Sequence, residues 1–313
     1  MYISNKFKYF LIKILSKFIK SIQYSIGMSH IANMRFKYKK IKNINDLDFK
    51  IFSQNGEDGI IDYLLYSLKI QKPKFIEIGV GDYSECNTRF IFERTSPKGL
   101  IIDCLKNLEK KVKKNLKLWK GELTIVEKFI NSKNIIETLN TNNFYNKIDL
   151  FSLDIDGIDY WVLEKLPKNF SKICVIEYNP TFGGKKKITV PNINNFDRSK
   201  YHYSNLCFGM SLIALTELMK KKKFYFVGTN ILRNNAFFIS DEYPKNKFFP
   251  KLKIQNIEKN AYSNISESRN KKKELNYLKG ASKLDEISSC EVIDLSKNKN
   301  KKVKLKSIFD KYK

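Results

Sequence analysis

Two hydrophobic patterns alternate between residues 46 and 241. Short apolar runs of strand length recur, and between them apolar residues return at the three- and four-residue spacing of an amphipathic helix. The runs predict strands at residues 75–78, 99–103, 123–130, 148–154, 172–178, 224–228 and 236–240. Alternating strands and helices form parallel sheets, but the last two strands are too close for a helical crossover. We therefore predict an α/β fold: a Rossmann-like seven-stranded, mostly parallel sheet with a C-terminal antiparallel hairpin and helices on both faces.

The chain divides into three parts on this pattern. Residues 46–241 form the predicted catalytic domain, and residues 1–45 precede it as a basic amphipathic segment. Residues 242–313 follow it as a lysine-rich C-terminal extension, whose role the pattern does not indicate.

The first strand ends in a glycine-rich turn. It carries Glu77 and continues into Gly79 and Gly81, where the absence of a Cβ atom lets the backbone approach a ligand closely. The second strand ends in Asp103, where an acid can accept both hydroxyls of a ribose. Position 84 is serine, so the turn lacks the third glycine of the dinucleotide fingerprint. This combination indicates a nucleoside without a pyrophosphate.

Three acids follow the fourth strand, at the edge where open α/β sheets bind ligands. Asp154 and Asp156 are two residues apart, so their side chains point to one face, and Asp159 comes shortly after them. The cluster could bind Mg²⁺ through oxygen ligands, or one aspartate could act as a general base. Asp156 is our first candidate for the catalytic group and Asp154 the second, while a capping and turn role stays open for Asp156 and Asp159. His202, in the loop expected to border the acceptor, is a further candidate base, with a plain surface position as the alternative.

Composition narrows the class of protein. The chain has 313 residues, of which 42% are hydrophobic and 13% aromatic, as in globular proteins. Its formal net charge is +27, and nearly all of the excess is lysine. Either an anionic partner or a general lysine bias explains this charge, and we favour the bias because lysine is abundant throughout. Five scattered cysteines without a C-x-x-C pair argue against a zinc site or disulfide framework, and for reduced packing residues in a cytoplasmic protein.

The N-terminal segment contains no acidic residue before Asp46. Residues 6–22 place an apolar row on one helical face and lysines on the other. Lysines interrupt every apolar run well short of the roughly 20 residues that span a bilayer. The helix either docks on an anionic membrane surface, at the inner face of the membrane, or packs on the catalytic domain, and both alternatives stay open. The apolar row comprises Phe7, Phe10, Leu11, Ile14, Leu15, Phe18 and Ile22, and the lysines are Lys6, Lys13, Lys17 and Lys20.

Four motifs occur in order along roughly residues 50–240. They are Ser53-Gln-Asn-Gly-Glu-Asp-Gly59, Phe75-Ile-Glu-Ile-Gly-Val-Gly-Asp82, Ser152-Leu-Asp-Ile-Asp-Gly157 and Val175-Ile-Glu-Tyr-Asn179. Together they resemble the FkbM-like S-adenosylmethionine-dependent methyltransferases, which have the class I fold and are often associated with glycan or surface-polysaccharide assembly. A short tail segment, Glu267-Ser-Arg269, also resembles the extension of one such subgroup.

The resemblance implies S-adenosylmethionine as the cofactor and a methyltransferase activity. A sugar or glycan hydroxyl has a pKa far above neutral, so its O-methylation needs a base or a metal. A small-molecule or glycan acceptor is therefore the expected partner. The implied cofactor-binding residues are Gln54 and Glu57 at the methionine end, Glu77, Gly79 and Gly81 in the turn, and Asp103 on the ribose. For Gln54 and Glu57, a helix-entry turn is the alternative.

Three other functions stay open. Asp154-Ile-Asp156 is also a D-x-D, which metal-dependent glycosyltransferases use to hold a nucleotide diphosphate. Asn179-Pro-Thr-Phe182 is similar to the N-P-P-Y/F pocket of nucleic-acid amino-methyltransferases. It lacks the second proline and follows the fifth strand instead of the fourth, so we do not expect a nucleic-acid partner. The third alternative is a membrane-recruited binding module with an inactive fold.

Overall fold

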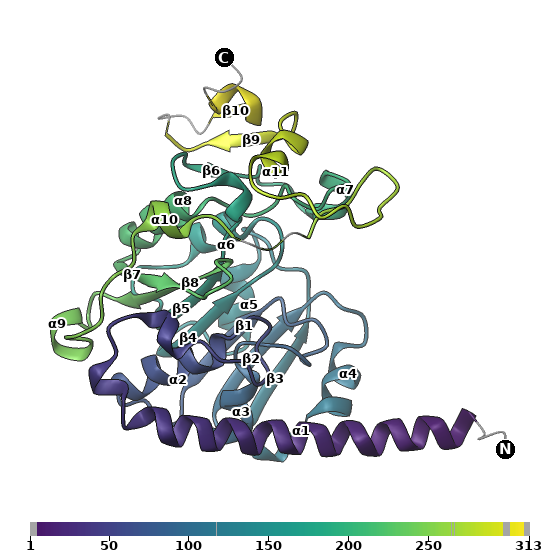
Figure 1. Cartoon of the computed structure of the whole chain (residues 1–313), viewed down its shortest axis with the longest axis vertical. Coiled ribbons are helices and arrows are strands. Elements are labelled where there is room, and N and C mark those ends of the chain that lie inside the picture. Colours follow the sequence, from purple (N-terminus) through teal and green to yellow (C-terminus); the bar gives the residue numbers. More distant parts are fainter. Residues whose placement is uncertain (1–4, 117, 264, 266, 297–300, 310–313) are drawn as a thin grey trace.

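A computed structural model describes residues 5–116, 118–263, 265, 267–296 and 301–309. Its centre is a seven-stranded sheet in the order β3-β2-β1-β4-β5-β8-β7 (Figure 1). These strands lie where the apolar runs predict them, although β3 ends earlier than expected. They are β1 Lys74–Ile78, β2 Lys98–Asp103, β3 Glu122–Glu127, β4 Ile148–Leu153, β5 Ser171–Glu177, β7 Phe224–Thr229 and β8 Asn235–Ser240.

Strand direction also confirms the predicted fold class. The strands β1 to β5 pair in parallel, whereas β8 runs antiparallel to both β5 and β7. The short loop between β7 and β8 requires this reversal, because a parallel return needs a crossover. From β1 the chain proceeds outward to β2 and β3, and it then returns to β4 on the other side of β1. The carboxyl ends of β1 and β4 therefore form the switch point where open sheets bind ligands.

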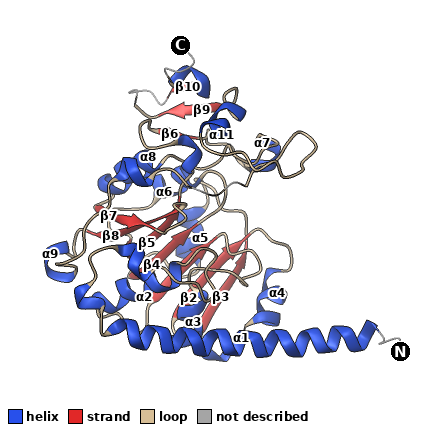
Figure 2. Cartoon of the chain, in the orientation of Figure 1, coloured by secondary structure: helices blue, strands red, loops and turns tan. Residues whose placement is uncertain are grey.

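Helices cover both faces of the sheet (Figure 2). Neighbouring residues of β1 point to opposite faces: Phe75 belongs to the core under α2, α3 and α4, and Ile76 to the core under α5, α6 and α8. This division buries the strands on both sides and explains their continuous apolar sequence. These helices are α2 Glu57–Ser67, α3 Arg89–Thr95, α4 Leu108–Asn115, α5 Ile135–Thr141, α6 Asp159–Lys165 and α8 Leu212–Lys221.

The C-terminal extension packs on the domain and adds a second sheet, at the top of Figure 1. In this sheet β9 Glu291–Asp294 pairs with β10 Lys301–Lys304 and with β6 Ile188–Thr189, which lies in the loop after β5. The apolar pattern does not predict this sheet, because its strands are short and β10 is mostly lysine. The shorter α-helices are α7 Arg198–Tyr201, α9 Lys245–Phe248, α10 Ile257–Asn260 and α11 Ala281–Glu286.

The N-terminal helix α1, Asn5–Arg35, is longer than predicted and runs along the lower side of the molecule in Figure 1. Its C-terminal half packs on the domain, with the ring of Tyr24 at 6.0 Å from that of Phe90 and with Ile31 buried. In the described part of the chain, no helix combines the length and apolarity needed to cross a bilayer. The side chains of residues 5–14, 16 and 17 lie outside the described part of the chain, and with them part of the predicted apolar row and of its lysines.

Gly79 allows the end of β1 to contact the end of β4. Its φ is +87°, in the left-handed region, and a Cβ atom there would lie 1.6 Å from the carbonyl oxygen of Asp154. Gly81 also has a positive φ of +53°, but a Cβ atom at Gly81 would meet no atom within 4 Å. A side chain at Gly79 would therefore cause both backbone strain and a collision, whereas one at Gly81 would cause strain alone.

We expect Gly79→Ala to lower the free energy of unfolding by about 3 kcal/mol or more, because the methyl group adds a collision to the left-handed strain. The matched control is Gly81→Ala, which should cost about 1 kcal/mol. Chemical denaturation of the two variants measures the difference. Equal losses would contradict the close approach of β1 and β4.

Candidate active site

A cavity of about 480 Å³, here called the first cavity, lies against the carboxyl ends of β1, β2 and β4. Its wall combines the turn after β1, the end of β2 and the loop after β4. The sheet thus brings together most of the residues predicted to bind the cofactor. Those that line the first cavity are Gln54, Glu77, Gly79, Gly81 and Asp103.

Asp103 is fixed at the end of β2 by two backbone N–H groups. Its Oδ2 accepts from the N–H of Gly81 and its Oδ1 from the N–H of Leu105, each at 2.8 Å. A carboxylate offers about four acceptor sites, so each oxygen keeps capacity for a ligand. Two such oxygens at the rim of the cavity match the adjacent hydroxyls of a ribose.

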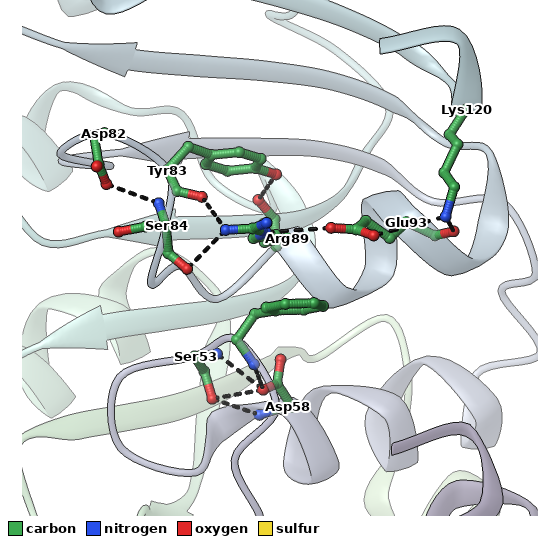
Figure 3. A network of polar contacts seen from close by, with 10 residues as sticks. Ser53, Asp58, Asp82, Tyr83, Ser84, Arg89, Glu93 and Lys120 are labelled. Carbon is green, nitrogen blue, oxygen red and sulfur yellow. Dashed lines mark hydrogen bonds and ion pairs between the residues drawn. The ribbon is translucent and has the colours of Figure 1, made fainter. Parts of the chain in front are cut away.

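Arg89 supports the turn after β1. Its buried guanidinium donates from Nη1 to the carbonyl oxygens of Tyr83 and Ser84, at 3.1 and 2.9 Å, and from Nε to Glu93 (Figure 3). Asp82 accepts from the backbone N–H of Ser84 at 2.9 Å within the same turn. These bonds satisfy the backbone internally, so the turn is held in shape by the protein itself.

Glu77 supports the other side of this turn. Its Oε1 accepts from the N–H of Asn87, and its Oε2 accepts from both the N–H and the hydroxyl of Thr88. Burial raises the pKa of Glu77 from 4.5 to about 7, and these donors oppose the rise. Glu77 therefore anchors the start of α3 while it lines the first cavity.

Asp58 pins the loop that carries Gln54. The Oδ2 atom of this buried side chain accepts the N–H groups of Ile51, Phe52 and Ser53 at 2.6, 2.7 and 2.9 Å, and Figure 3 shows the Ser53 contact. Burial raises the pKa of Asp58 to about 6, although the hydrogen bonds oppose that rise. Gln54 follows directly and lines the cavity.

Glu57 takes a different place from the predicted one. It is fully buried, and its Oε2 accepts from the N–H of Asn55 at 2.9 Å. Its Oε1 accepts from the side-chain amides of Asn230 and Asn235 at 2.8 and 2.7 Å. Glu57 therefore joins the Gln54 loop to the β7–β8 hairpin, and it is absent from the described residues that line the cavity. Glu57 therefore contacts the loop that carries Gln54 without lining the first cavity itself.

A second cavity, of about 370 Å³, adjoins the first. Gln54, Asp154 and Asp156 line both cavities, so the two meet at the predicted acidic cluster. One carboxylate oxygen from each of Asp154, Asp156 and Glu177 lies within 4.8 Å of the others. Asp154 and Asp156 follow β4, and Glu177 ends the neighbouring parallel strand β5, which brings all three to one edge of the sheet.

The protonation of this carboxylate cluster follows from its crowding. Burial, with Asp156 adjacent, raises the pKa of Asp154 to about 8. Burial and both aspartates raise the pKa of Glu177 well above its ordinary value, and Glu177 shares a hydrogen bond with Asp154. Partial burial raises the pKa of Asp156 as well, but an ion pair with Arg198 opposes that rise. These shifts favour the protonated forms of Asp154 and Glu177, and Arg198 favours the ionised form of Asp156.

Asp159 and His202 lie away from this centre. Asp159 accepts the N–H groups of Ile155 and Gly157, each at 3.0 Å, so it closes the turn after β4 instead of joining the carboxylate cluster. The turn role that the sequence left open is the one observed. The Nδ1 atom of His202 contacts the hydroxyl of Ser204 at 2.7 Å, and His202 is not among the described residues lining either cavity.

Three charged residues of the second cavity are not predicted as site residues from the sequence. Arg198 comes from α7, while Glu267 and Lys283 come from the C-terminal extension. Lys283 is buried, its ammonium group donates to the carbonyl of Ile265, and burial lowers its pKa. In a chain with 59 lysines and arginines, no local signal separates Lys283 or Arg198 from the rest. The tail motif at Glu267 was the one hint.

Size alone does not identify the site. A larger cavity, of about 1010 Å³, lies between α1, α2 and α9 and is bordered by Pro73, which precedes β1. It is therefore at the amino ends of the strands. None of the predicted site residues is among its described lining residues. The convergence of polar groups distinguishes the two smaller cavities instead.

Neither a protein-family model nor a curated protein matches the chain. Among solved structures, PKMT2 from Rickettsia typhi in complex with AdoHcy is 12% identical, with a TM-score of 0.38, over 58% of this chain and 53% of that one. This chain thus spans about half the length of that match. A chain of the complex between the Haloferax volcanii Trm112 methyltransferase activator and a methyltransferase is 8% identical, with a TM-score of 0.32. The match covers 54% of this chain and 73% of that one. A protein named as a sarcosine dimethylglycine methyltransferase, from Galdieria sulphuraria, is 12% identical, with a TM-score of 0.35. The match covers 63% of this chain and 75% of that one. Likenesses of this size do not identify a function.

Glu77 should give the protein a measurable pH dependence. Because its pKa is about 7 in the folded state and 4.5 ordinarily, the folded state binds more protons between those two values. The free energy of unfolding should therefore fall as pH rises through this window, by up to about 3 kcal/mol from this group. Glu77→Gln should remove that part of the slope in denaturation series, whereas Glu109→Gln, at an exposed position, should not. An unchanged slope in Glu77→Gln would contradict the raised pKa.

Proposed function

We propose that the protein is an S-adenosylmethionine-dependent methyltransferase that methylates a hydroxyl oxygen of a sugar or glycan. The junction of the two cavities carries the proposal. The first cavity is bordered by a turn and an acid suited to a nucleoside, and the carboxylate cluster stands where it meets the second. The FkbM-like motifs fall in these same segments and support the same cofactor and a role in polysaccharide assembly.

The residues of the first cavity fit an adenosine with an amino-acid end. Asp103 keeps acceptor capacity for two ribose hydroxyls, and Gly81 leaves open space where a side chain would stand. Asn235 is buried and lines the cavity, and its Oδ1 has no hydrogen-bond partner among the described residues. A buried acceptor of this kind suits a ligand amine. The bound cofactor would supply an electrophilic methyl group on its sulfonium.

Asp154 is the best-placed general base. A hydroxyl acceptor must lose its proton as its oxygen is methylated, and a base works best when its pKa lies near the working pH. The pKa of Asp154 is about 8, and Glu177 beside it can share the proton. Asp156, which the sequence ranked first, is engaged by Arg198. We therefore assign proton removal to Asp154 and a supporting charge to Asp156.

The second cavity suits an acceptor rich in hydroxyl groups. Carboxylates, amides and cations from different elements line it, so it offers both hydrogen-bond donors and acceptors to a ligand. A sugar, which carries both functions on every hydroxyl, uses such a wall fully. The polar lining residues include Glu177, Thr181, Arg198, Asn205, Glu267 and Lys283.

A divalent cation is the other way to neutralise the carboxylate cluster. Asp154, Asp156 and Glu177 offer the oxygen ligands that Mg²⁺ takes. Binding would displace the proton held by Asp154 and Glu177, and it would compete with Arg198 for Asp156. In this proposal the candidate ligands of Mg²⁺ are these three residues, and Asp159 is not one of them.

The rival functions have less support. A D-x-D glycosyltransferase would use the carboxylate cluster to hold a metal and a nucleotide diphosphate, but the turn after β1 lacks the third glycine of a pyrophosphate-binding fingerprint. A nucleic-acid methyltransferase would need the amide of Asn179 free to bind a base. Both N–H groups of that amide donate to the carbonyl oxygens of Leu206 and Phe208, at 2.8 and 2.9 Å.

Calorimetric titration of the full chain tests the cofactor. We expect S-adenosylmethionine and S-adenosylhomocysteine to bind, and Asp103→Ala to weaken both by about tenfold or more through loss of charged hydrogen bonds to the ribose. Glu109→Ala, at an exposed carboxylate, is the control and should bind normally. Binding of a UDP-sugar with Mg²⁺ instead would favour the glycosyltransferase, and binding of neither would favour an inactive module.

A pH series of methyl transfer, on an acceptor found by screening sugar nucleotides and glycans, tests the base. Turnover should rise with pH and level off above about 8, because Asp154 must lose its proton to act. Asp154→Asn should lower kcat by about a hundredfold or more and remove this rise. His202→Ala should keep full activity, since it lines neither cavity.

Two results would change this assignment. Full turnover in Asp154→Asn would exclude Asp154 as the base. Loss of turnover in EDTA that Mg²⁺ restores would assign the carboxylate cluster to a cation instead of a proton.

A further inference from the structure

The helix α1 uses two faces in different ways. Tyr24, Gly27 and Ile31 face the domain: the ring of Tyr24 lies against Phe90, and a Cβ atom on Gly27 would lie 2.6 Å from Ile51. Ile31 is buried in the same small core. The spacing of these three residues, three and then four positions apart, defines one stripe along the helix. This stripe is the attachment of α1 to the protein.

A second apolar stripe faces away from the domain. Its members are between 44% and 64% exposed, although all are large and apolar. Ile22 and Ile26 are each two positions from Tyr24, which places each of them about 160° around the helix from that residue. Figure 1 shows α1 continuing past the body of the molecule, so its N-terminal part has little protein beside it. This outer stripe comprises Leu15, Phe18, Ile19, Ile22 and Ile26.

This arrangement reconciles the two alternatives for the N-terminal segment. Packing on the domain accounts for the stripe of Tyr24, Gly27 and Ile31. It leaves the outer stripe in water, and a helix that only packed on its own domain would direct its large apolar residues inward. A row of this kind, rather than scattered single residues, marks a surface that meets an apolar partner.

Charge identifies the kind of partner. Residues 1–45 contain nine lysines and one arginine and no aspartate or glutamate. A second copy of α1 would bring the same cations against these, so pairing of two copies would be opposed by repulsion. An anionic lipid surface offers both an acyl boundary for the outer stripe and phosphates for the lysines.

We propose that α1 lies in the interface of an anionic membrane, with the outer stripe in the acyl boundary and the domain attached to the opposite side of the helix. The attachment stripe makes α1 part of the folded body, so the membrane holds the domain in one orientation. This surface is independent of the two cavities at the carboxyl ends of the strands, and it adds a location to the proposed function without depending on it.

Vesicle co-sedimentation of the full chain tests the proposal. We expect binding to vesicles of equal parts phosphatidylcholine and phosphatidylglycerol, much weaker binding to phosphatidylcholine alone, and weakening by salt. The triple variant Phe18→Ser, Ile22→Ser and Ile26→Ser should bind the anionic vesicles at least tenfold more weakly. The three side chains that this variant replaces are exposed, so the fold and the calorimetric binding of S-adenosylmethionine should not change.

The matched control is the double variant Ile193→Ser and Ile254→Ser, which removes exposed apolar side chains outside α1 and should bind vesicles normally. Equal binding by the triple variant and the wild type would overturn the proposal, as would equal binding to neutral and anionic vesicles. A wild-type dimer that becomes a monomer in the triple variant, without vesicle binding, would assign the outer stripe to a second copy. If the wild-type protein binds the vesicles as expected but does not bind S-adenosylmethionine or S-adenosylhomocysteine, only the proposed function is contradicted.

Discussion

The contact between Gly79 and the carbonyl group of Asp154 sets the geometry of the candidate site. The glycine turn that lines the first cavity follows β1, and the carboxylate cluster follows β4, so the two adjoin only if no side chain separates them. Backbone bonds extend this contact: the N–H of Gly79 donates to Ile102 at 2.9 Å, and the N–H of Asp154 donates to Ile78 at 3.0 Å. Gly81 then donates to the carboxylate of Asp103. Three strand ends are thus joined into one rim before any ligand binds, which is the preorganisation that a transfer reaction needs.

Buried carboxylates have two different roles in this rim, and the groups that they contact determine which role each one has. Asp58, Glu77 and Asp159 are buried against backbone N–H groups, and each fixes a loop by accepting several of them. Asp154 and Glu177 face each other instead. A carboxylate surrounded by N–H groups is stabilised as an anion, whereas two adjacent carboxyl groups must share a proton or a cation. The chemistry is therefore expected at the pair with the fewest donors, even though the sequence offers many acids.

Local sequence patterns predict the sheet and the first cavity well, because both depend on neighbours in the chain. Continuous apolar runs identify strands buried on both faces. A glycine or an acid directly after such a run predicts a turn or a polar group at that strand end. Even here the pattern predicts one strand end wrongly. The apolar run of β3 continues to residue 130, but β3 ends at Glu127 because its partner β2 ends at Asp103. Residues such as Arg198 and Lys283 reach the site only through tertiary packing, and nothing beside them in the chain predicts it.

This difference divides the site into halves with different origins. The first cavity is built almost entirely from strand ends, so its shape is tied to the sheet. The second cavity takes its outer wall from α7 and from the C-terminal extension, which is held in place by the pairing of β9 with β6. Substitutions in the extension can therefore alter the wall of the second cavity without disturbing Asp103 or the glycine turn. If the first cavity holds the methyl donor and the second the acceptor, as proposed, the extension is the part of the wall that can change the preference for an acceptor independently of the sheet.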